Sequence, residues 1–415
     1  MTEKKQDGPG HGSGAAEHAS LSEAMEQAFR RYDAAPALLL AAGETVTYAE
    51  LSQRVSAMAG ALAEAGVTPG DRVTMQAEKS VEGLALYLAT LKVGAVFNPL
   101  NPAYTPAELE HFLTDAQPAL VAAPSKRLAE IGDLARRAGA RSLLSLEADG
   151  SGTLRERAST AHPVATWRQR APDDLAALVY TSGTTGRSKG AMITQRNLVS
   201  NAQTLISLWG LTAGETLIHA LPIYHVHGLF VALNTALLGG LTLRWMERFQ
   251  AQEVLAALES GHVIMGVPTF YTRLLAEPGL TQRACQSMRL IISGSAPLLP
   301  ETHEAFRART GHAILERYGM TETGMIASNP LAGDRVPGSV GCALPGVAVR
   351  VADATGKELP RGETGGVEVR GPNVFSGYWR LPERTRQDFR PDGWFITGFS
   401  LSKQLEHAIT ASAKK

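Results

Sequence analysis

Hydrophobic and polar residues in the first part of the chain recur at helical spacing. In the stretch TYAELSQRVSAMAGALAEAG, apolar residues would share one face of a helix: Leu51, Val55, Met58 and Leu62. Thr47, followed three residues later by Glu50, forms the pattern of a capping box, and Gly66 is suited to end the helix. The pattern therefore predicts an amphipathic helix that begins after Thr47.

Short apolar runs alternate with such helices. The runs at 71–77 (DRVTMQA) and 173–180 (DDLAALVY) favour strands, whereas 80–96 (SVEGLALYLATLKVGAV) favours a helix. The stretch TPAELEHFLTDA at 105–116 repeats the helix-start signal, with a threonine cap, a proline in the first turn and a glutamate three residues after the cap. Residues 125–170 are polar and predict less regular structure. The alternation of helices and strands favours an α/β fold.

Glycine and proline become frequent after Asp334, and alternating runs such as GGVEVRG indicate short strands there. We therefore expect two doubly wound αβ layers followed by a small β-rich subdomain. The expected organisation is a flexible tail, two αβ subdomains, a β-rich subdomain and a divergent tail, at residues 1–24, 25–170, 171–333, 334–397 and 398–415.

Composition narrows the class of protein. The 415 residues include 40 basic and 40 acidic side chains, so no basic face for a nucleic acid is indicated. Cys285 and Cys342 are the two cysteines, which is too few for a disulfide framework and fits a reducing compartment. The first 20 residues lack the apolar core of a signal peptide, and no window is apolar enough to span a membrane. We expect a cytoplasmic protein, with the oligomeric state left open.

The stretch YTSGTTGRSKG, from Tyr180 to Gly190, is typical of a loop that binds phosphate. Gly183 and Gly186 would let backbone N–H groups approach phosphate oxygens, and Lys189 adds a cation. Hydroxyl groups come from Thr181, Ser182, Thr184 and Thr185. The spacing does not match a Walker A loop, because Gly190 stands where a magnesium-binding hydroxyl is required. From composition alone, a polar hairpin between two strands is the alternative.

The longer string YTSGTTGRSKGAM resembles the phosphate-binding signature of the adenylate-forming superfamily, which includes acyl-CoA synthetases, peptide-synthetase adenylation domains and luciferases. Further matching motifs follow in the family's order: ALPIYHVHGL, GVPTFYTRL, ISGSAPL, ERYGMTET and GGVEVRGPNVFSGYW. The resemblance covers about residues 25 to 397, and the motif sequences are most similar to those of malonyl-CoA synthetases. It implies the large N-terminal domain of the adenylate-forming fold.

The resemblance also implies a reaction and its cofactors. Such enzymes activate a carboxylic acid with ATP and Mg²⁺ to an acyl-adenylate, which coenzyme A then converts to a thioester. Lys189 would hold phosphate oxygens, Glu322 would bind the Mg²⁺ and Thr321 would contact the α-phosphate. Tyr318 would offer an aromatic face to adenine. The other implied nucleotide contacts are Ser295, Ala296, Pro297, Glu316 and Gly319. The alternatives are a helix first-turn carboxylate for Glu322 and a buried aromatic for Tyr318.

Substrate selection is assigned by the same resemblance to a second group of residues. His225 would lie beside the acyl pocket, while Val226 and Met325 would shape the space near the α-carbon of the acid. Arg273 stands where malonate-activating members place a cation for the distal carboxylate, and a guanidinium group suits such a partner. The alternative for Arg273 is a surface residue on a helix. His225 and His227 would share a face of a strand, and packing is the alternative to a zinc pair because no further ligand set accompanies them.

The sequence departs from the family pattern after DGWFITG. Phe399 stands where the family has an aspartate that binds the ribose, and phenylalanine cannot accept a hydrogen bond. The sequence then ends at Lys415, so we expect the smaller C-terminal domain to be missing, adenylation to be slowed and thioester formation to be nearly lost. Two alternatives stay open: an inactive ATP- or AMP-binding pseudoenzyme, and an enzyme that adenylates another small carboxylic acid.

Overall fold

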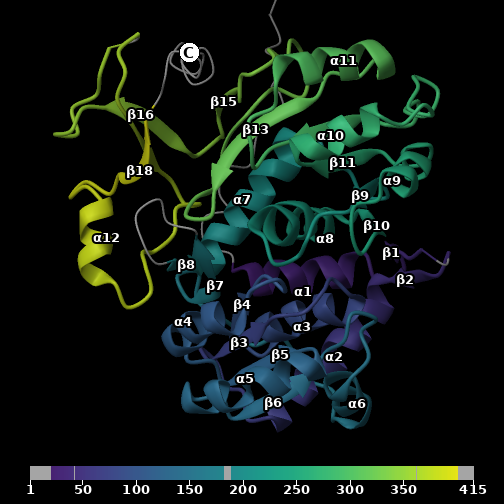
Figure 1. Cartoon of the computed structure of the whole chain (residues 1–415), viewed down its shortest axis with the longest axis vertical. Coiled ribbons are helices and arrows are strands. Elements are labelled where there is room, and N and C mark those ends of the chain that lie inside the picture. The colour runs from purple at the N-terminus through teal and green to yellow at the C-terminus, as the bar shows by residue number, and fades with distance from the viewer. Residues whose placement is uncertain (1–19, 42, 182–187, 361, 401–415) are drawn as a thin grey trace, which may run out of the picture.

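The computed structural model describes residues 20–41, 43–181, 188–360 and 362–400. Two large sheets and one small sheet make up the fold, and Figure 1 shows the large sheets stacked with helices between and around them. Expectations of an α/β fold with a small β-rich part are therefore confirmed.

The first large sheet has six strands in the order β6-β5-β3-β4-β7-β8. All neighbouring pairs are parallel except the hairpin of β7 and β8. The strands are β3 (Arg72–Met75), β4 (Val96–Pro99), β5 (Leu120–Ala123), β6 (Ser142–Ser145), β7 (Leu175–Thr181) and β8 (Lys189–Thr194).

The second large sheet has nine strands in the order β15-β14-β13-β12-β11-β9-β10-β1-β2. Its central strands run parallel from β13 to β1 and are flanked by antiparallel neighbours. The strands are β1 (Pro36–Leu39), β2 (Thr45–Thr47), β9 (Thr216–His219), β10 (Thr242–Trp245), β11 (Val263–Gly266), β12 (Leu290–Ser293), β13 (Leu315–Met320), β14 (Gly324–Ser328) and β15 (Cys342–Ala343).

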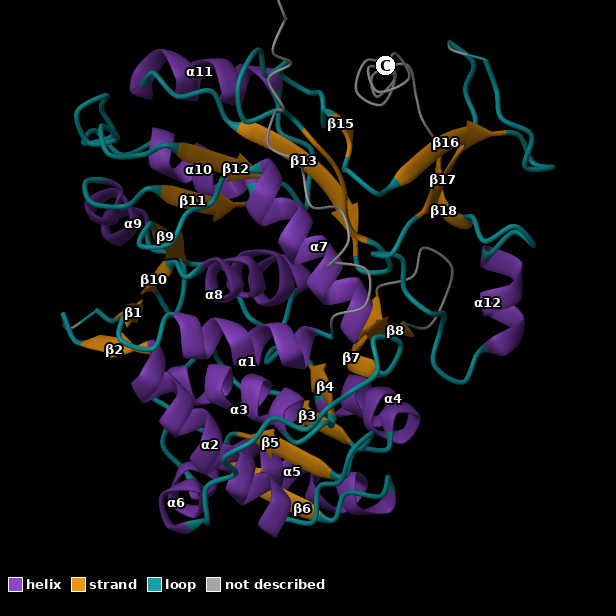
Figure 2. Cartoon of the chain, turned by 180° about the vertical axis from the view of Figure 1, so that it is seen from behind, coloured by secondary structure: helices purple, strands orange, loops and turns teal. Residues whose placement is uncertain are grey.

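Helices cover both large sheets. Between the sheets, α1 (Leu21–Arg31), α7 (Gln195–Leu208) and α8 (Thr235–Gly239) pack on one another, as Figure 2 shows. The π-helix η1 (His227–Asn234) leads into α8 and is buried along its length. The other helices are α2 (Tyr48–Glu64), α3 (Val81–Lys92), α4 (Pro106–Ala116), α5 (Ser125–Arg137), α6 (Thr153–Thr160), α9 (Ala251–Leu258), α10 (Pro268–Leu275), α11 (Pro300–Thr310) and α12 (Pro382–Asp388). No helix of the described ranges has both the length and the apolarity to cross a bilayer.

Local signals in the sequence predicted several elements correctly. Both capping boxes form, with Thr47 and Glu50 at the start of α2 and Thr105 and Glu108 at the start of α4. The four predicted apolar residues of α2 are buried. The expectation of less regular structure at 125–170 was wrong, because α5, β6 and α6 lie there. Neither α5 nor α6 has a side-chain cap at its start, so the usual signal for a helix start is missing from the sequence.

Two boundaries of the structure differ from the divisions drawn along the sequence. The helix α1 begins at Leu21 with Ser20 as its cap, so the end of the expected tail is helical. The strands β1 and β2 belong to the nine-stranded sheet, while β7 and β8, which lie beyond residue 170, complete the six-stranded sheet. Each large sheet therefore contains strands from both sides of residue 170, so the two sheets do not divide the chain there.

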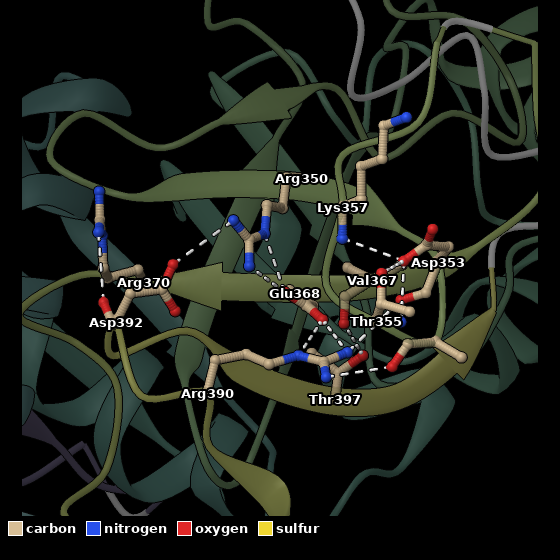
Figure 3. A network of polar contacts seen from close by, with 11 residues as sticks. Arg350, Asp353, Thr355, Lys357, Val367, Glu368, Arg370, Arg390, Asp392 and Thr397 are labelled. Carbon is tan, nitrogen blue, oxygen red and sulfur yellow. Dashed lines mark hydrogen bonds and ion pairs between the residues drawn. The ribbon is translucent and has the colours of Figure 1, made fainter.

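The small sheet has three antiparallel strands, β16 (Ala348–Ala352), β17 (Gly366–Arg370) and β18 (Phe395–Ser400). Glu368 is buried at its centre and accepts hydrogen bonds from Arg350 at 2.8 Å and from Arg390 at 2.9 Å. Figure 3 shows the two guanidinium groups approaching Glu368 from opposite sides. The Arg350 group also lies 4.3 Å from the ring centroid of Trp394. A shared buried carboxylate thus joins β16 and β17 to the segment before β18.

Removing that carboxylate should destabilise the small sheet. Glu368→Ala leaves two partly buried guanidinium groups without their partner, so we expect a loss of about 3 kcal/mol or more in the free energy of unfolding. Asp392→Ala is the matched control, because the Asp392 carboxylate lies 3.8 Å from Arg350 and is 57% exposed, and it should cost less than about 1 kcal/mol. Urea unfolding compares the two, and equal losses would contradict the central role of Glu368.

Candidate functional site

The predicted phosphate loop connects β7 and β8, which pair as an antiparallel hairpin. Thr181 and Lys189 face each other in the register of this pair. The Thr181 hydroxyl is buried and lacks a hydrogen-bond partner among the described residues. The predicted residues between them lie outside the described ranges: Ser182, Gly183, Thr184, Thr185 and Gly186. The assignment of this loop to phosphate therefore stays a prediction.

A distant segment runs alongside β8 and completes the surroundings of Lys189. Gly377 accepts a hydrogen bond from Met192 at 3.0 Å, and Trp379 donates to Gly190 at 2.8 Å. This pairing places Tyr378 beside Lys189, whose Nζ lies 4.4 Å from the centroid of the tyrosine ring. A cation over an aromatic face is attracted by the ring's quadrupole. The lysine is therefore held at the end of β8 by a residue from the segment that follows the small sheet's second strand.

Glu322 lies in the turn between β13 and β14, close to the same tyrosine. Its side chain is 6% exposed, and Oε1 accepts a hydrogen bond from the Tyr378 hydroxyl at 3.1 Å. Burial raises the pKa of Glu322 despite the opposing effects of that hydrogen bond and of Lys189. The alternative interpretation of Glu322 as a helix first-turn residue was wrong, because the turn of a β-hairpin holds it.

Two residues of α12 complete the cluster around Lys189. Asp388 lies 3.9 Å from Lys189 Nζ and accepts a hydrogen bond from Arg384 at 2.8 Å. Partial burial, together with the charge of Arg384, lowers the pKa of Lys189. The cluster thus brings two cations and two carboxylates to one end of the β7–β8 hairpin.

The donor set around Glu322 fits a magnesium ion of the kind that protein holds through few ligands. Mg²⁺ prefers oxygen ligands and commonly keeps several waters or phosphate oxygens alongside one or two carboxylates. Within the described ranges, no group of three or more His, Cys, Asp or Glu side chains is arranged to hold a metal by itself. A single buried carboxylate beside a lysine suits an ion that arrives with phosphate.

The residues predicted to contact a nucleotide base lie on β13 and directly after β12. Tyr318 is on β13, and burial, together with the Glu322 charge, raises its pKa to about 12. Its ring lies edge-on to Phe399 with centroids 6.2 Å apart. Ser295, Ala296 and Pro297 are exposed directly after β12. The Tyr318 ring is therefore partly buried, with Phe399 against it, and its predicted contact with adenine stays a prediction.

Glu316 and Gly319 occupy structural positions on β13. The Glu316 carboxylate is buried and accepts a hydrogen bond from the backbone of Gly338 at 2.9 Å. Gly319 pairs with Met325 on β14. Both residues therefore fix the hairpin that carries Thr321 and Glu322, and their predicted contacts with a nucleotide stay predictions.

An amide clamp fixes the other side of this hairpin. The Asn201 side chain on α7 accepts from the Met325 backbone N–H at 3.0 Å and donates to the Met325 carbonyl at 2.9 Å. Met325 and Val226 are both buried, and Val226 and Thr321 line the same small cavity between α7, η1 and the hairpin. The structure thus brings Thr321, Val226 and Met325 to one region, and the predicted contacts of Val226 and Met325 with the acid and of Thr321 with the α-phosphate stay predictions.

His225 and His227 lie in a turn and at the first residue of η1 rather than on a strand. His225 Nδ1 accepts from the His227 backbone N–H at 3.2 Å. The His227 ring is buried, and its Nδ1 lies 3.2 Å from the Ser295 hydroxyl. Burial, followed by the Arg317 charge, lowers the pKa of both rings, although His225 keeps an exposed edge. Both histidines are therefore neutral around pH 7.

Arg317, on β13, is a site residue that the sequence did not reveal. Its side chain is 4% exposed, and Nε and Nη2 are buried without a hydrogen-bond partner among the described residues. The guanidinium packs against Gly294, where an added Cβ would lie 2.3 Å from its Cζ. Burial lowers the pKa of Arg317 to about 10, so the group stays charged at neutral pH. A buried charge with unmet donors is costly unless a ligand supplies the acceptors.

Other unpaired polar atoms lie near this arginine. His227 Nε2 and the Ser293 hydroxyl are buried and have no partner among the described residues. Ser293 is the last residue of β12 and directly precedes Gly294, against which the Arg317 guanidinium packs. The carboxyl ends of β12 and β13 therefore present donors that suit an anionic or strongly polar ligand.

Arg273 lies apart from this buried set. It is exposed in the last turn of α10, with Cζ 4.7 Å from the ring centroid of Phe249. The surface position is what the alternative interpretation expected, and the role of Arg273 in binding a carboxylate stays a prediction.

Sequence reasoning also missed Tyr378, Asp388 and Arg384. Tyr378 stands inside the motif GGVEVRGPNVFSGYW, which was recognised without a role for each residue. Its contact with Glu322 depends on pairing between distant segments, for which the sequence carries no local signal.

Comparison with known proteins identifies the family of the chain. A family model described as AMP-binding enzyme matches residues 25–379. The chain belongs to this family of AMP-binding enzymes. ATP-bound MatB from Rhodopseudomonas palustris is 51% identical, with a TM-score of 0.89 over 92% of this chain and 76% of that chain. A malonyl-CoA ligase in a ternary product complex with methylmalonyl-CoA and AMP is 34% identical, with a TM-score of 0.74 over 88% of this chain and 74% of that chain.

Among curated proteins, mitochondrial malonate–CoA ligase ACSF3 from Mus musculus is 37% identical over 394 residues. The match covers 85% of this chain and 67% of that protein, and the other curated malonate–CoA ligases are covered to 66% or less. The chain therefore spans about two thirds or less of their length. The resemblance to malonyl-CoA synthetases, and with it the adenylate-forming fold, is confirmed.

Replacing the Glu322 carboxyl by a neutral amide should raise the stability of the protein and lower its activity. Because folding favours the protonated carboxyl, its ionisation costs stability as pH rises through the raised pKa. Glu322→Gln should therefore be more stable than the wild type at about pH 8, and the gain should vanish as pH falls below the ordinary value of 4.5. We also expect a loss of adenylation of about a hundredfold or more, because a group that offsets charge in the transition state is removed.

Urea unfolding at several pH values measures the first effect, and pyrophosphate exchange measures the second. Glu215→Gln is the comparison variant, since that carboxylate accepts hydrogen bonds from Arg289 at 2.6 and 2.8 Å and its pKa is lowered, so its loss should destabilise the protein at pH 8 and leave exchange unchanged. A Glu322→Gln variant that is less stable at high pH, or fully active, would contradict the assigned role.

Proposed function

We propose that the chain activates a small dicarboxylic acid, malonate or methylmalonate, with ATP and Mg²⁺, and passes the acyl group to coenzyme A. The observation that carries this proposal is Arg317, a buried guanidinium whose Nε and Nη2 have no acceptor within the part of the chain that the structure describes. A dicarboxylate has a second carboxylate to offer once the first has reacted, and a guanidinium group binds carboxylates through paired N–H donors. Similarity to malonate–CoA ligases supports the same substrate class.

In the first half-reaction, one carboxylate oxygen attacks the α-phosphorus of ATP and pyrophosphate leaves. The product is an acyl-adenylate, and catalysis depends mainly on positioning and on offsetting negative charge. Lys189 would hold phosphate oxygens, and Glu322 would bind the Mg²⁺, which supplies positive charge beside the phosphates. Thr321, in the same turn, would donate to the α-phosphate. In the second half-reaction the coenzyme A thiol attacks the acyl carbon and AMP leaves.

At the other end of the site, the acid would lie between η1 and the ends of β12 and β13. His225 and His227 are neutral there, because their pKa values are lowered by burial and by Arg317. Neutral imidazoles can accept or donate hydrogen bonds without competing for the carboxylate that Arg317 requires. Val226 and Met325 would limit the space beside the α-carbon of the acid.

A second candidate is an ATP- or AMP-binding protein without turnover. The observation that favours it is Phe399, which is 50% exposed and lies edge-on to Tyr318. An apolar ring at this place offers no acceptor to a ribose hydroxyl. Nucleotide binding without acid-dependent exchange would distinguish this candidate from the enzyme.

The proposed activity is tested with malonate, methylmalonate, acetate and octanoate in two assays, ATP–pyrophosphate exchange and formation of the CoA thioester. We expect exchange with malonate or methylmalonate and none with octanoate. Exchange that is equally fast with acetate would favour an enzyme for another small acid, and binding of MgATP without any exchange would favour the second candidate.

Replacing Arg317 should abolish the preference for dicarboxylates. Arg317→Met keeps an unbranched side chain but removes the buried charge. We therefore expect kcat/KM for malonate to fall about 30-fold or more, as for loss of a buried charge pair. Activity with acetate should change little. Because the unbound protein loses an unpaired buried cation, the variant should be at least as stable as the wild type in urea.

Arg273→Ala is the comparison variant on the exposed side. A loss of malonate activity in Arg273→Ala with none in Arg317→Met would transfer the selecting role to Arg273 and contradict the assignment of Arg317.

A further inference from the structure

Lys79 is buried where the two large sheets meet. It follows β3 of the six-stranded sheet and is 4% exposed. Its Nζ donates to the carbonyl of His219 at 2.7 Å and to that of Met246 at 2.6 Å, at the carboxyl ends of β9 and β10. The ammonium also lies 4.2 Å from the ring centroid of Trp245. One side chain of the first sheet is therefore bonded to two strands of the second.

The third contact of Lys79 fixes the state of a buried histidine. Nζ lies 2.6 Å from His219 Nδ1, and His219 Nε2 lies 2.9 Å from the carbonyl of Gly228. A carbonyl can only accept, so Nε2 carries the proton and Nδ1 accepts from the lysine. Burial, and then the charge of Lys79, lowers the pKa of His219 well below its ordinary value. The ring is thus neutral, in one tautomer, and stacked on Trp245 with centroids 5.5 Å apart.

The carbonyl that accepts a hydrogen bond from His219 Nε2 belongs to η1. Gly228 is the second residue of η1, directly after His227 and three residues after His225. The turn before it is tight, because a Cβ on Gly228 would lie 2.0 Å from the Pro222 carbonyl oxygen. The Nδ1 atom of His227 lies 3.2 Å from the Ser295 hydroxyl. Hydrogen bonds therefore run from Lys79 through His219 to the start of η1, where the acid is expected.

We propose that Lys79 is a positioning residue for the acid-binding end of the site, acting through His219 on the start of η1. The proposal rests on the proposed function for the identity of the ligand, while the chain of contacts stands without it. π-helical segments are rare and are frequently found at functional sites. A displacement of about 1 Å at a binding residue can reduce turnover up to about a hundredfold.

The matched control is Lys92, a second buried lysine near a tryptophan. It is 2% exposed, donates to the carbonyl of Ala165 at 3.1 Å and lies 5.4 Å from the ring centroid of Trp167. It belongs to α3 and does not contact His219 or η1. Lys79→Met and Lys92→Met each remove one buried ammonium, so a general loss of packing would affect both alike.

The first test does not require turnover. In ¹⁵N NMR of the histidine side chains, the wild type should show His219 protonated at Nε2. Lys79→Met should change the His219 signal and shift those of His225 and His227, whereas Lys92→Met should leave all three unchanged. Unchanged histidine signals in Lys79→Met, or equal shifts in both variants, would overturn the proposal.

The second test separates binding of the acid from binding of the nucleotide. We expect Lys79→Met to raise KM for malonate about ten- to a hundredfold while KM for MgATP stays at the wild-type value. Lys79→Gln, which keeps N–H donors, should recover part of the loss, and it replaces the methionine variant if that one does not fold. An equal rise in both KM values, or no rise for malonate, would contradict the positioning role. If the wild type itself shows no acid-dependent exchange, the proposed function fails, and the histidine signals still decide whether Lys79 sets η1.

Discussion

The burial of two basic side chains, Lys79 and Arg317, near the carboxyl ends of parallel strands is a constraint that the surrounding structure must meet. Both are nearly inaccessible to solvent, and burial lowers the pKa of each. Lys79 meets its requirement with two carbonyls and an imidazole nitrogen, and thereby joins the two large sheets. Among the described residues, Nε and Nη2 of Arg317 have no acceptor. The cost of burying a basic group is thus met by the protein itself at Lys79, and we propose that a ligand meets it at Arg317.

The remaining parts of the site are arranged around these cations by the topology. In open α/β sheets, ligands bind beyond the carboxyl ends of the strands. Here β7, β12 and β13 all end at the site, and the segment around Tyr378 pairs with β8 to cover it. Glu322, Tyr378 and Lys189 come from three distant stretches of the chain and meet only because these strands end together. The places proposed for the nucleotide and for the acid are therefore both built on the ends of these strands.

How much of this could be predicted depends on the range of the interactions. Local signals were sufficient for α2 and α4, since Thr47 and Thr105 cap them as the sequence indicated. At α5 and α6 no side chain caps the helix, so the usual local signal for a helix start is missing. Motif resemblance placed Lys189, Glu322 and Thr321 near one another. It could not identify Arg317, because the absence of a partner is a property of the folded interior.

The central claim is that Arg317 receives the distal carboxylate of the substrate. The most direct test is a crystal structure of the protein with malonate and a non-hydrolysable ATP analogue. The account predicts one carboxylate within hydrogen-bonding distance of Arg317 Nε and Nη2, with the other directed at the nucleotide near Thr321. Malonate bound on Arg273 or elsewhere, with Arg317 still lacking a partner, would contradict it.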